Sequence, residues 1–165
     1  MDCMSDHERD EPRTGEPFLA DYLQFLLATA SGLASHSFHV QAAAAGVSVA
    51  EWRVLACLSD CDGQSVTELA RLAQMEQSRL TRVIERMDNR GHVTRKRCRD
   101  DRRKVHVWLT GQGAGIARDL VARARAHEAE FIESCLSPAE GRRLKALLTK
   151  VIERAGKGKV HAIRR

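Results

Sequence analysis

The chain has 165 residues, which suits one compact domain, or one domain with an added oligomerisation element. Five cysteines without a CxxC pair argue against a disulfide framework, and the low aromatic content of 4% argues against a β-sandwich. The N-terminus lacks the pattern of a signal peptide, and no apolar run is long enough to cross a membrane. We therefore expect a cytoplasmic protein with reduced thiols.

The net charge of +5 is distributed unevenly along the chain. Residues 1–16 carry six acids and two bases, which predicts a disordered acidic tail and leaves a charge of +9 on the remaining residues. Between Thr94 and Lys104 there are seven bases and two acids. A basic patch of this kind favours a polyanion such as nucleic acid as the partner, and a solvated charged hairpin is the alternative.

Residues 17–47 are predicted to form one long helix. Apolar side chains recur at spacings of three and four residues from Phe18 to Leu33, the period of one helix face. Pro17 suits the first turn of such a helix, and Gly46 suits its end.

Three shorter helices are predicted next. Ser48 and Glu51 form a capping box for the first of them, and either Ser65 or Thr67 caps the second. The third, Gln77–Asn89, has an apolar stripe and ends at Gly91.

A two-stranded hairpin follows, over roughly His92–Arg97 and Lys104–Leu109. Apolar and polar residues alternate in its second strand, which is the period of a half-buried strand. Together with the preceding helices, the hairpin makes residues 48–110 a winged helix-turn-helix domain.

Residues 111–155 are predicted to form two further helices, the second opened by the capping box of Ser137 and Glu140 with Pro138 at its first position. Residues 156–165 are predicted to form a flexible basic tail. The fold class is therefore mainly α with a small β-hairpin wing. The flanking helices have apolar stripes too long for the small central domain to cover, so we expect a two-fold dimer, and a monomeric helical bundle is the alternative.

The second helix of a helix-turn-helix enters the DNA major groove, where arginine can bind guanine and hydroxyl or amide side chains can bind bases or phosphates. Basic residues at the hairpin tip suit the minor groove, with Asp101 holding an arginine or a turn amide in place. Arg82 and Arg86 have a second interpretation, as surface residues paired to Glu85 and Asp88. The predicted DNA contacts are Ser65, Thr67, Gln77, Ser78, Arg79, Thr81, Arg82, Arg86, Asp101, Arg102, Arg103 and Lys104.

These motifs in combination resemble the MarR family of bacterial transcriptional regulators, over about residues 17–156. His92, where the family usually has an apolar residue, and Cys98 depart from the pattern. The matching segments are Trp52–Leu55, Val66–Ala70, Ser78–Met87, Gly91–Val93, Asp101–Arg103 and Val107–Thr110.

The resemblance implies a homodimer that binds a pseudo-palindromic operator in double-stranded DNA. It further implies a repressor that is released by a small molecule, often an aromatic carboxylic acid. No catalytic motif is present, so we expect no enzyme activity and no cofactor. The alternative is a winged helix that docks a protein partner. DNA binding should weaken steeply with added salt, whereas binding through a mostly apolar protein interface should not.

A ligand site is expected where the first long helix, the helix after Ser48 and the helix after Thr110 meet. In aromatic-acid-responsive relatives a Trp-Arg pair often binds the ligand, and an arginine fork suits a carboxylate. The alternatives are a core position for Trp52 and, for Arg53, a surface ion pair with Glu51 or with an acid on another helix. The ligand candidates are Ser31, Ser35, His36, His39, Trp52 and Arg53.

Oxidation is a rival switch. Cys57 and Cys61 share a helix face, although that spacing suits a disulfide poorly, and Cys98 lies among basic residues that favour its thiolate. Metal sensing has less support, because no compact histidine or cysteine site is present.

Overall fold

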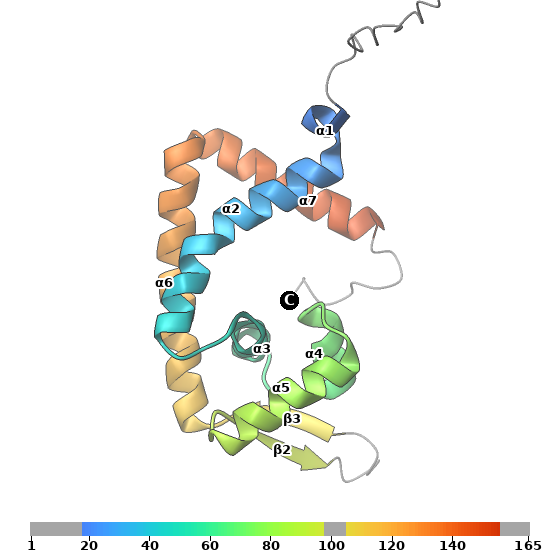
Figure 1. The fold of residues 1–165 in the computed structure, drawn as a ribbon, viewed down its shortest axis with the longest axis vertical. Helices are drawn as coiled ribbons and strands as arrows, with labels where there is room; N and C mark the ends of the chain where they lie inside the picture. Colours follow the sequence, from blue (N-terminus) through green and yellow to red (C-terminus); the bar gives the residue numbers. More distant parts are fainter. Residues whose placement is uncertain (1–17, 98–104, 156–165) are drawn as a thin grey trace, which may run out of the picture. The chain divides into compact units, whose positions relative to one another are not determined.

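A computed structural model of the chain describes residues 18–97 and 105–155 (Figure 1). The chain divides into two compact units, residues 1–35 and residues 36–165. The expected fold class is confirmed, because the described residues form helices and a small antiparallel sheet.

The first unit contains helix α1 (Phe18–Asp21) and the first part of α2 (Leu23–Ala44). The single helix predicted from residue 17 is in fact interrupted at Tyr22, whose ring stacks on Phe18 with the ring centroids 4.8 Å apart. The apolar side chains of this segment are solvent-exposed within the single chain. They are Phe18, Leu19, Tyr22, Leu23, Phe25, Leu26, Leu27 and Leu33.

The second unit contains the end of α2 and the whole winged helix. Figure 1 shows α3, α4, α5 and the hairpin gathered together, with α6 leading away from the last strand. The elements in chain order are α3 (Val49–Asp60), β1 (Gln64–Ser65), α4 (Val66–Leu72), α5 (Gln77–Asn89), β2 (Val93–Arg97), β3 (Val105–Leu109), α6 (Gly111–Cys135) and α7 (Pro138–Ala155).

One buried apolar cluster holds the second unit together. It takes side chains from both the helices and the sheet, as the predicted apolar stripes require. Its largest members, each under 2% exposed, are Val47, Val54, Leu55, Leu58, Leu69, Leu80, Val83, Ile84, Met87, Val93, Val107 and Leu120.

The sheet has three antiparallel strands in the order β1-β3-β2. In the predicted hairpin, Val93 lies opposite Leu109 and Arg95 opposite Val107. The third strand, β1, pairs Gln64 with Val107 and was not predicted, because a strand of two residues shows no periodicity.

The loop before β1 is fixed to β3. One carboxylate oxygen of Asp62 accepts hydrogen bonds from the amides of Gly63 and Leu109, both at 2.9 Å. Gly63 has a φ of +72°, and a Cβ at this position would lie 2.4 Å from the Trp108 ring. Only glycine therefore lets the Trp108 ring lie against this turn.

The predicted helix caps are present. Ser48 and Glu51 form the expected capping box of α3, and Ser65 rather than Thr67 caps α4 by accepting from the amide of Glu68 at 3.2 Å. Ser137 and Glu140 exchange the predicted bonds at the start of α7.

Over the described ranges, 18–97 and 105–155, no single helix is long and apolar enough to cross a membrane. The pair α2 and α3 reaches that length and composition only jointly, with a bend of 94° between the two helices.

Candidate nucleic-acid interface

Helix α5 has one face in the core and the opposite face in solvent. Leu80, Val83, Ile84 and Met87 are each no more than 1% exposed. Because these four residues share one helix face, the core determines which side of α5 points outward. The outward side carries the predicted DNA contacts Gln77, Ser78, Arg79, Arg82 and Arg86, all exposed.

The arginines on this outward face keep their charge unpaired within the described structure. No acid among the described residues forms an ion pair with Arg79, Arg82 or Arg86. The interpretation in which Arg82 and Arg86 pair with Glu85 and Asp88 is therefore not what the structure shows.

The acids of α5 instead pair with the wing. Arg95 on β2 contacts Asp88 at 2.8 Å and Glu85 at 3.8 Å. These contacts hold the base of the wing against α5 and remove two negative charges from competition with a polyanion.

Four predicted contact residues line one groove beside α5. Ser65, Thr67, Gln77 and Thr81 come together there, although the hydroxyl of Ser65 is also occupied by its helix cap. The groove has a volume of about 530 Å³ and is completed by Val66, Ile84, Arg95 and Val105. The predicted contacts Asp101, Arg102, Arg103 and Lys104, together with Cys98, lie outside the described residues.

The N-terminus of α5 lacks a side-chain cap among the described residues. Its N-cap residue, Glu76, makes no side-chain hydrogen bond to the first turn in the part of the chain that the structure describes. By contrast, serine or threonine hydroxyls cap α3, α4 and α6. Free amides and the helix dipole attract a phosphate group at such an end, and the exposed carboxylate of Glu76 opposes that attraction.

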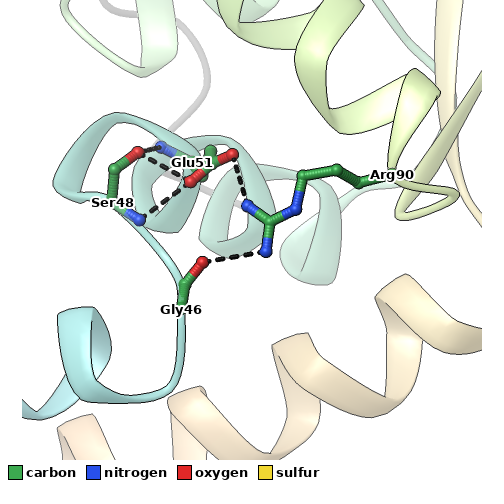
Figure 2. A network of polar contacts seen from close by, with 4 residues as sticks. All are labelled: Gly46, Ser48, Glu51 and Arg90. Carbon is green, nitrogen blue, oxygen red and sulfur yellow. Dashed lines mark hydrogen bonds and ion pairs between the residues drawn. The ribbon is translucent and has the colours of Figure 1, made fainter.

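The C-terminal end of α5 is tied to α3 by a polar network that we call the Arg90 clasp, formed by Gly46, Ser48, Glu51 and Arg90. Figure 2 shows the guanidinium of Arg90 between Glu51 and Gly46. Arg90 donates to the Glu51 carboxylate at 3.0 Å and to the Gly46 carbonyl at 2.9 Å. The amide and hydroxyl of Ser48 donate to the other Glu51 oxygen, both at 2.8 Å.

Glu51 is only 5% exposed, yet it stays ionised. Burial by itself would raise the pKa of this carboxyl. The hydrogen bonds from Ser48 and the charge and hydrogen bond of Arg90 outweigh burial, so the net effect lowers the pKa of Glu51.

His92 is a buried histidine between α5 and β2. It is 4% exposed, and its Nδ1 has no hydrogen-bond partner among the described residues. Burial lowers the pKa of His92, the positive charge of Arg90 lowers it further, and the negative charge of Glu51 opposes both. The folded protein therefore favours the neutral imidazole.

The structure separates the predicted Trp-Arg pair. Trp52 packs edge-on against Phe38, with ring centroids 4.9 Å apart, whereas Arg53 donates to the carbonyl of Ala73 at 3.4 Å. The pairing of Arg53 with Glu51 that the sequence left open is absent, because Glu51 is bonded to Arg90 and Ser48.

The other predicted ligand residues lie on α2. Ser31 and Ser35 belong to the first unit, where the Ser35 hydroxyl donates to the Ser31 carbonyl at 2.7 Å. His36 is exposed, while the ring of His39 lies 6.2 Å from that of Phe38. Of the predicted set, the second unit therefore brings His39 and Trp52 to the same phenylalanine.

One residue of the aromatic cluster around Phe38 was not predicted from the sequence. His127 on α6 is hydrogen-bonded to Ser37, and its ring lies 6.1 Å from that of Phe38. His127 continues the stripe of Ala117, Leu120 and Ala124 at helical spacing, and this pattern could have revealed it.

The described cysteines give little support to a redox switch. Burial raises the pKa of the Cys57 thiol, and the charge of Asp60 raises it further against the opposing charge of Arg53. A raised pKa disfavours the reactive thiolate. No group of three or more potential metal ligands occurs among the described residues.

The sequence and the fold of this chain are similar to those of known transcriptional regulators. Residues 47–105 match the MarR family model. The crystal structure of the MarR family transcriptional regulator SPO1453 from Silicibacter pomeroyi DSS-3 is 42% identical, with a TM-score of 0.76 over 85% of this chain and 99% of the other. The chain belongs to the MarR family. It is therefore a DNA-binding transcriptional regulator rather than an enzyme, as the sequence predicted.

Two further proteins are similar to this chain. The HTH-type transcriptional regulator TtmR from Methylorubrum extorquens is 29% identical over 68% of this chain, which spans 56% of the length of TtmR. The crystal structure of Rv2887 from Mycobacterium tuberculosis, in complex with salicylic acid, is 26% identical. The two structures align with a TM-score of 0.65 over 80% of this chain and 98% of the other.

We predict that His92 makes folding sensitive to mild acid. Its folded pKa is lowered, so above the unfolded pKa of about 6.5 neither state binds the proton. As the pH falls below that value, the unfolded state binds a proton that the folded state does not, and stability decreases by at most about 1.4 kcal/mol per pH unit.

Urea unfolding at pH 7.5 and 5.5 measures this effect in the parent protein and in His92→Leu. The substitution should reduce the loss of unfolding free energy between the two pH values. The lowered pKa of Glu51 affects the unfolding free energy only below about pH 4.5, and it does so in both proteins. An equal pH dependence in the two proteins would show that His92 is not the source.

Proposed function

We propose that this MarR-family protein is a dimeric repressor that recognises a pseudo-palindromic operator with α5 in the major groove. The observation that carries the proposal is the outward face of α5. Arg79, Arg82 and Arg86 have no ion-pair partner among the described residues, while the two acids within α5, Glu85 and Asp88, are bound by Arg95. A cytoplasmic location goes with this role, because the operator lies in bacterial DNA.

In this proposal the two ends of α5 have different tasks. Gln77, Ser78 and Arg79 stand at the N-terminal end, which approaches the base edges in a helix-turn-helix complex. Arg82 and Arg86 lie one helical turn apart and are suited to successive phosphates. Ser65 and Thr67 would position the backbone from the neighbouring groove, and the residues of the wing tip, Asp101 to Lys104, would approach the minor groove.

The dimer proposal rests on apolar surface that the single chain leaves uncovered. On α7, Leu144, Leu147, Val151 and Ile152 are each between 42% and 52% exposed. The apolar residues of α1 and the first part of α2 are exposed as well. Burial against a second copy would cover such surface, and would present two α5 helices to half-sites about one DNA turn apart.

The effector proposal rests on the aromatic cluster of Phe38, Trp52, His39 and His127 in the second unit. Rv2887, which is 26% identical, has been crystallised with salicylic acid. An aromatic acid could place its ring against Trp52 and its carboxylate against His127 and Ser37. Arg53 is engaged by the Ala73 carbonyl, so we assign the carboxylate to His127 in its place.

Arg79→Ala tests base recognition. If Arg79 makes a bidentate contact with guanine, the substitution should weaken binding to a duplex selected from a random pool by about 1–3 kcal/mol. Binding to a scrambled duplex should change little. Fluorescence anisotropy titrations measure both, with Arg142→Ala on α7 as the control for charge. Equal losses on the two duplexes would reassign Arg79 to the DNA backbone.

Leu147→Glu tests the dimer. A charge buried without a partner at an apolar interface is costly, so this substitution should convert a dimer to a monomer at micromolar concentration. Thr149→Glu, on the same helix, makes the same charge change at a polar exposed position and should leave the dimer intact. Sedimentation should give twice the chain mass of 18.4 kDa for the parent. A monomeric parent that still binds DNA would contradict the proposal.

The aromatic cluster can be tested by fluorescence. Trp108→Phe leaves Trp52 as the single tryptophan of the chain, and its emission should change when salicylic acid or a related aromatic acid binds. In that background, His127→Ala should weaken acid binding about tenfold or more, as expected for a lost hydrogen bond to a charged group. His36→Ala, an exposed control, should not. An acid that releases DNA without changing the Trp52 emission would place the effector site elsewhere.

A further inference from the structure

The Arg90 clasp joins three segments through one side chain. Arg90 is the C-cap residue of α5, Glu51 lies in the first turn of α3, and Gly46 follows α2. Because the two contacts use different nitrogens, Nη1 to Glu51 and Nη2 to Gly46, the guanidinium plane is held at two points. A planar fork fixed in this way restricts rotation as well as distance.

This restriction matters because the other contacts of α5 with the rest of the second unit are largely apolar. The buried side chains Leu80, Val83, Ile84 and Met87 supply burial energy, which is non-directional. Hydrogen bonds have strict geometry, so the clasp and the Arg95 ion pairs add directional contacts that constrain the angle of α5. The two sets differ, since Arg95 ties α5 to the wing, whereas Arg90 ties it to α3 and to Gly46.

A small change in that angle has a large effect at the other end of the helix. The 13 residues of α5 span about 20 Å, so a tilt of a few degrees at Arg90 displaces Gln77 by about 1 Å. Hydrogen bonds to base edges tolerate only a few tenths of an ångström.

We propose that Arg90 is a positioning residue for DNA recognition: its clasp on Glu51 and Gly46 sets the angle at which α5 presents Gln77, Ser78 and Arg79 to the bases. Arg90 itself needs no contact with DNA. This inference rests on the proposed DNA binding by α5 and assigns part of its specificity to a network at the opposite end of the helix.

The chain contains a matched control for the clasp. Ser137 and Glu140 form a second capping box with the same chemistry, in which the Ser137 amide and hydroxyl donate to Glu140 at 2.9 and 2.6 Å. Glu140 is exposed, and no arginine among the described residues bonds to it. Glutamine is also accepted at this position of a capping box, so a Glu→Gln change keeps the cap in both places.

Glu51→Gln and Glu140→Gln therefore make the same chemical change in the same kind of cap, one at a buried position inside the clasp and one at an exposed position outside it. Each raises the net charge by one, which by electrostatics alone would tighten DNA binding. If the clasp positions α5, Glu51→Gln should instead bind the duplex selected by the parent protein about tenfold more weakly, the effect of one lost charge-assisted hydrogen bond. Its binding to a scrambled duplex and its salt slope should match those of Glu140→Gln.

Arg90→Lys provides an independent test, because it keeps the charge while a single ammonium cannot reproduce the fork. It should also lose about tenfold on the selected duplex and nothing on the scrambled one. Circular dichroism and thermal unfolding check that each variant is folded. If Glu51→Gln does not fold, the result for Arg90→Lys decides the test. If Glu51→Gln and Arg90→Lys fold and bind both duplexes as Glu140→Gln does, the positioning role proposed for Arg90 is overturned. Failure of the parent to select any duplex would overturn the proposed function and this inference with it.

Discussion

The burial of one face of α5 is the constraint on which the rest of the molecule depends. Leu80, Val83, Ile84 and Met87 enter the common core with α3, α4 and the sheet. This burial removes apolar area from water and fixes which side of the helix faces outward. The basic outward face, the ion pairs to the wing and the Arg90 clasp all follow from that placement, since each uses residues that the core leaves at the surface or at the helix end.

Charge is distributed so that α5 presents bases without neutralising them. Glu85 and Asp88 would offset the neighbouring arginines if they were free, but Arg95 binds both of them. Glu51 is likewise satisfied by Arg90 and Ser48. The same ion pairs that hold the helix in place therefore leave an uncompensated positive surface, which favours association with a polyanion.

The sequence predicted the parts of the fold that repeat or that carry a local chemical signature. The caps at Ser48 and Ser137 and the span Gln77–Asn89 were predicted correctly, because capping residues and apolar periodicity act over a few residues. The strand β1 was missed because two residues have no period, and the break at Tyr22 was missed because the apolar pattern continues through it.

The candidate sites were less predictable, because they depend on which distant residues meet. Nothing in the local sequence pairs Glu51 with Arg90, 39 positions later, or brings His127 to Phe38. The expectation that Arg53 accompanies Trp52 came from the family resemblance, in which an adjacent Trp-Arg pair often binds the ligand. Neighbouring residues on a helix point about 100° apart, and the structure directs them to different elements.

The central claim, that α5 reads the major groove of a two-fold operator, is tested most directly by guanine methylation protection. The N7 atom of guanine lies in the major groove, so a duplex selected by the protein should show protected guanines in two patches about one helical turn apart. Protection confined to one patch would contradict the dimeric arrangement. Binding to the selected duplex that leaves every guanine N7 reactive would contradict the placement of α5 in the major groove.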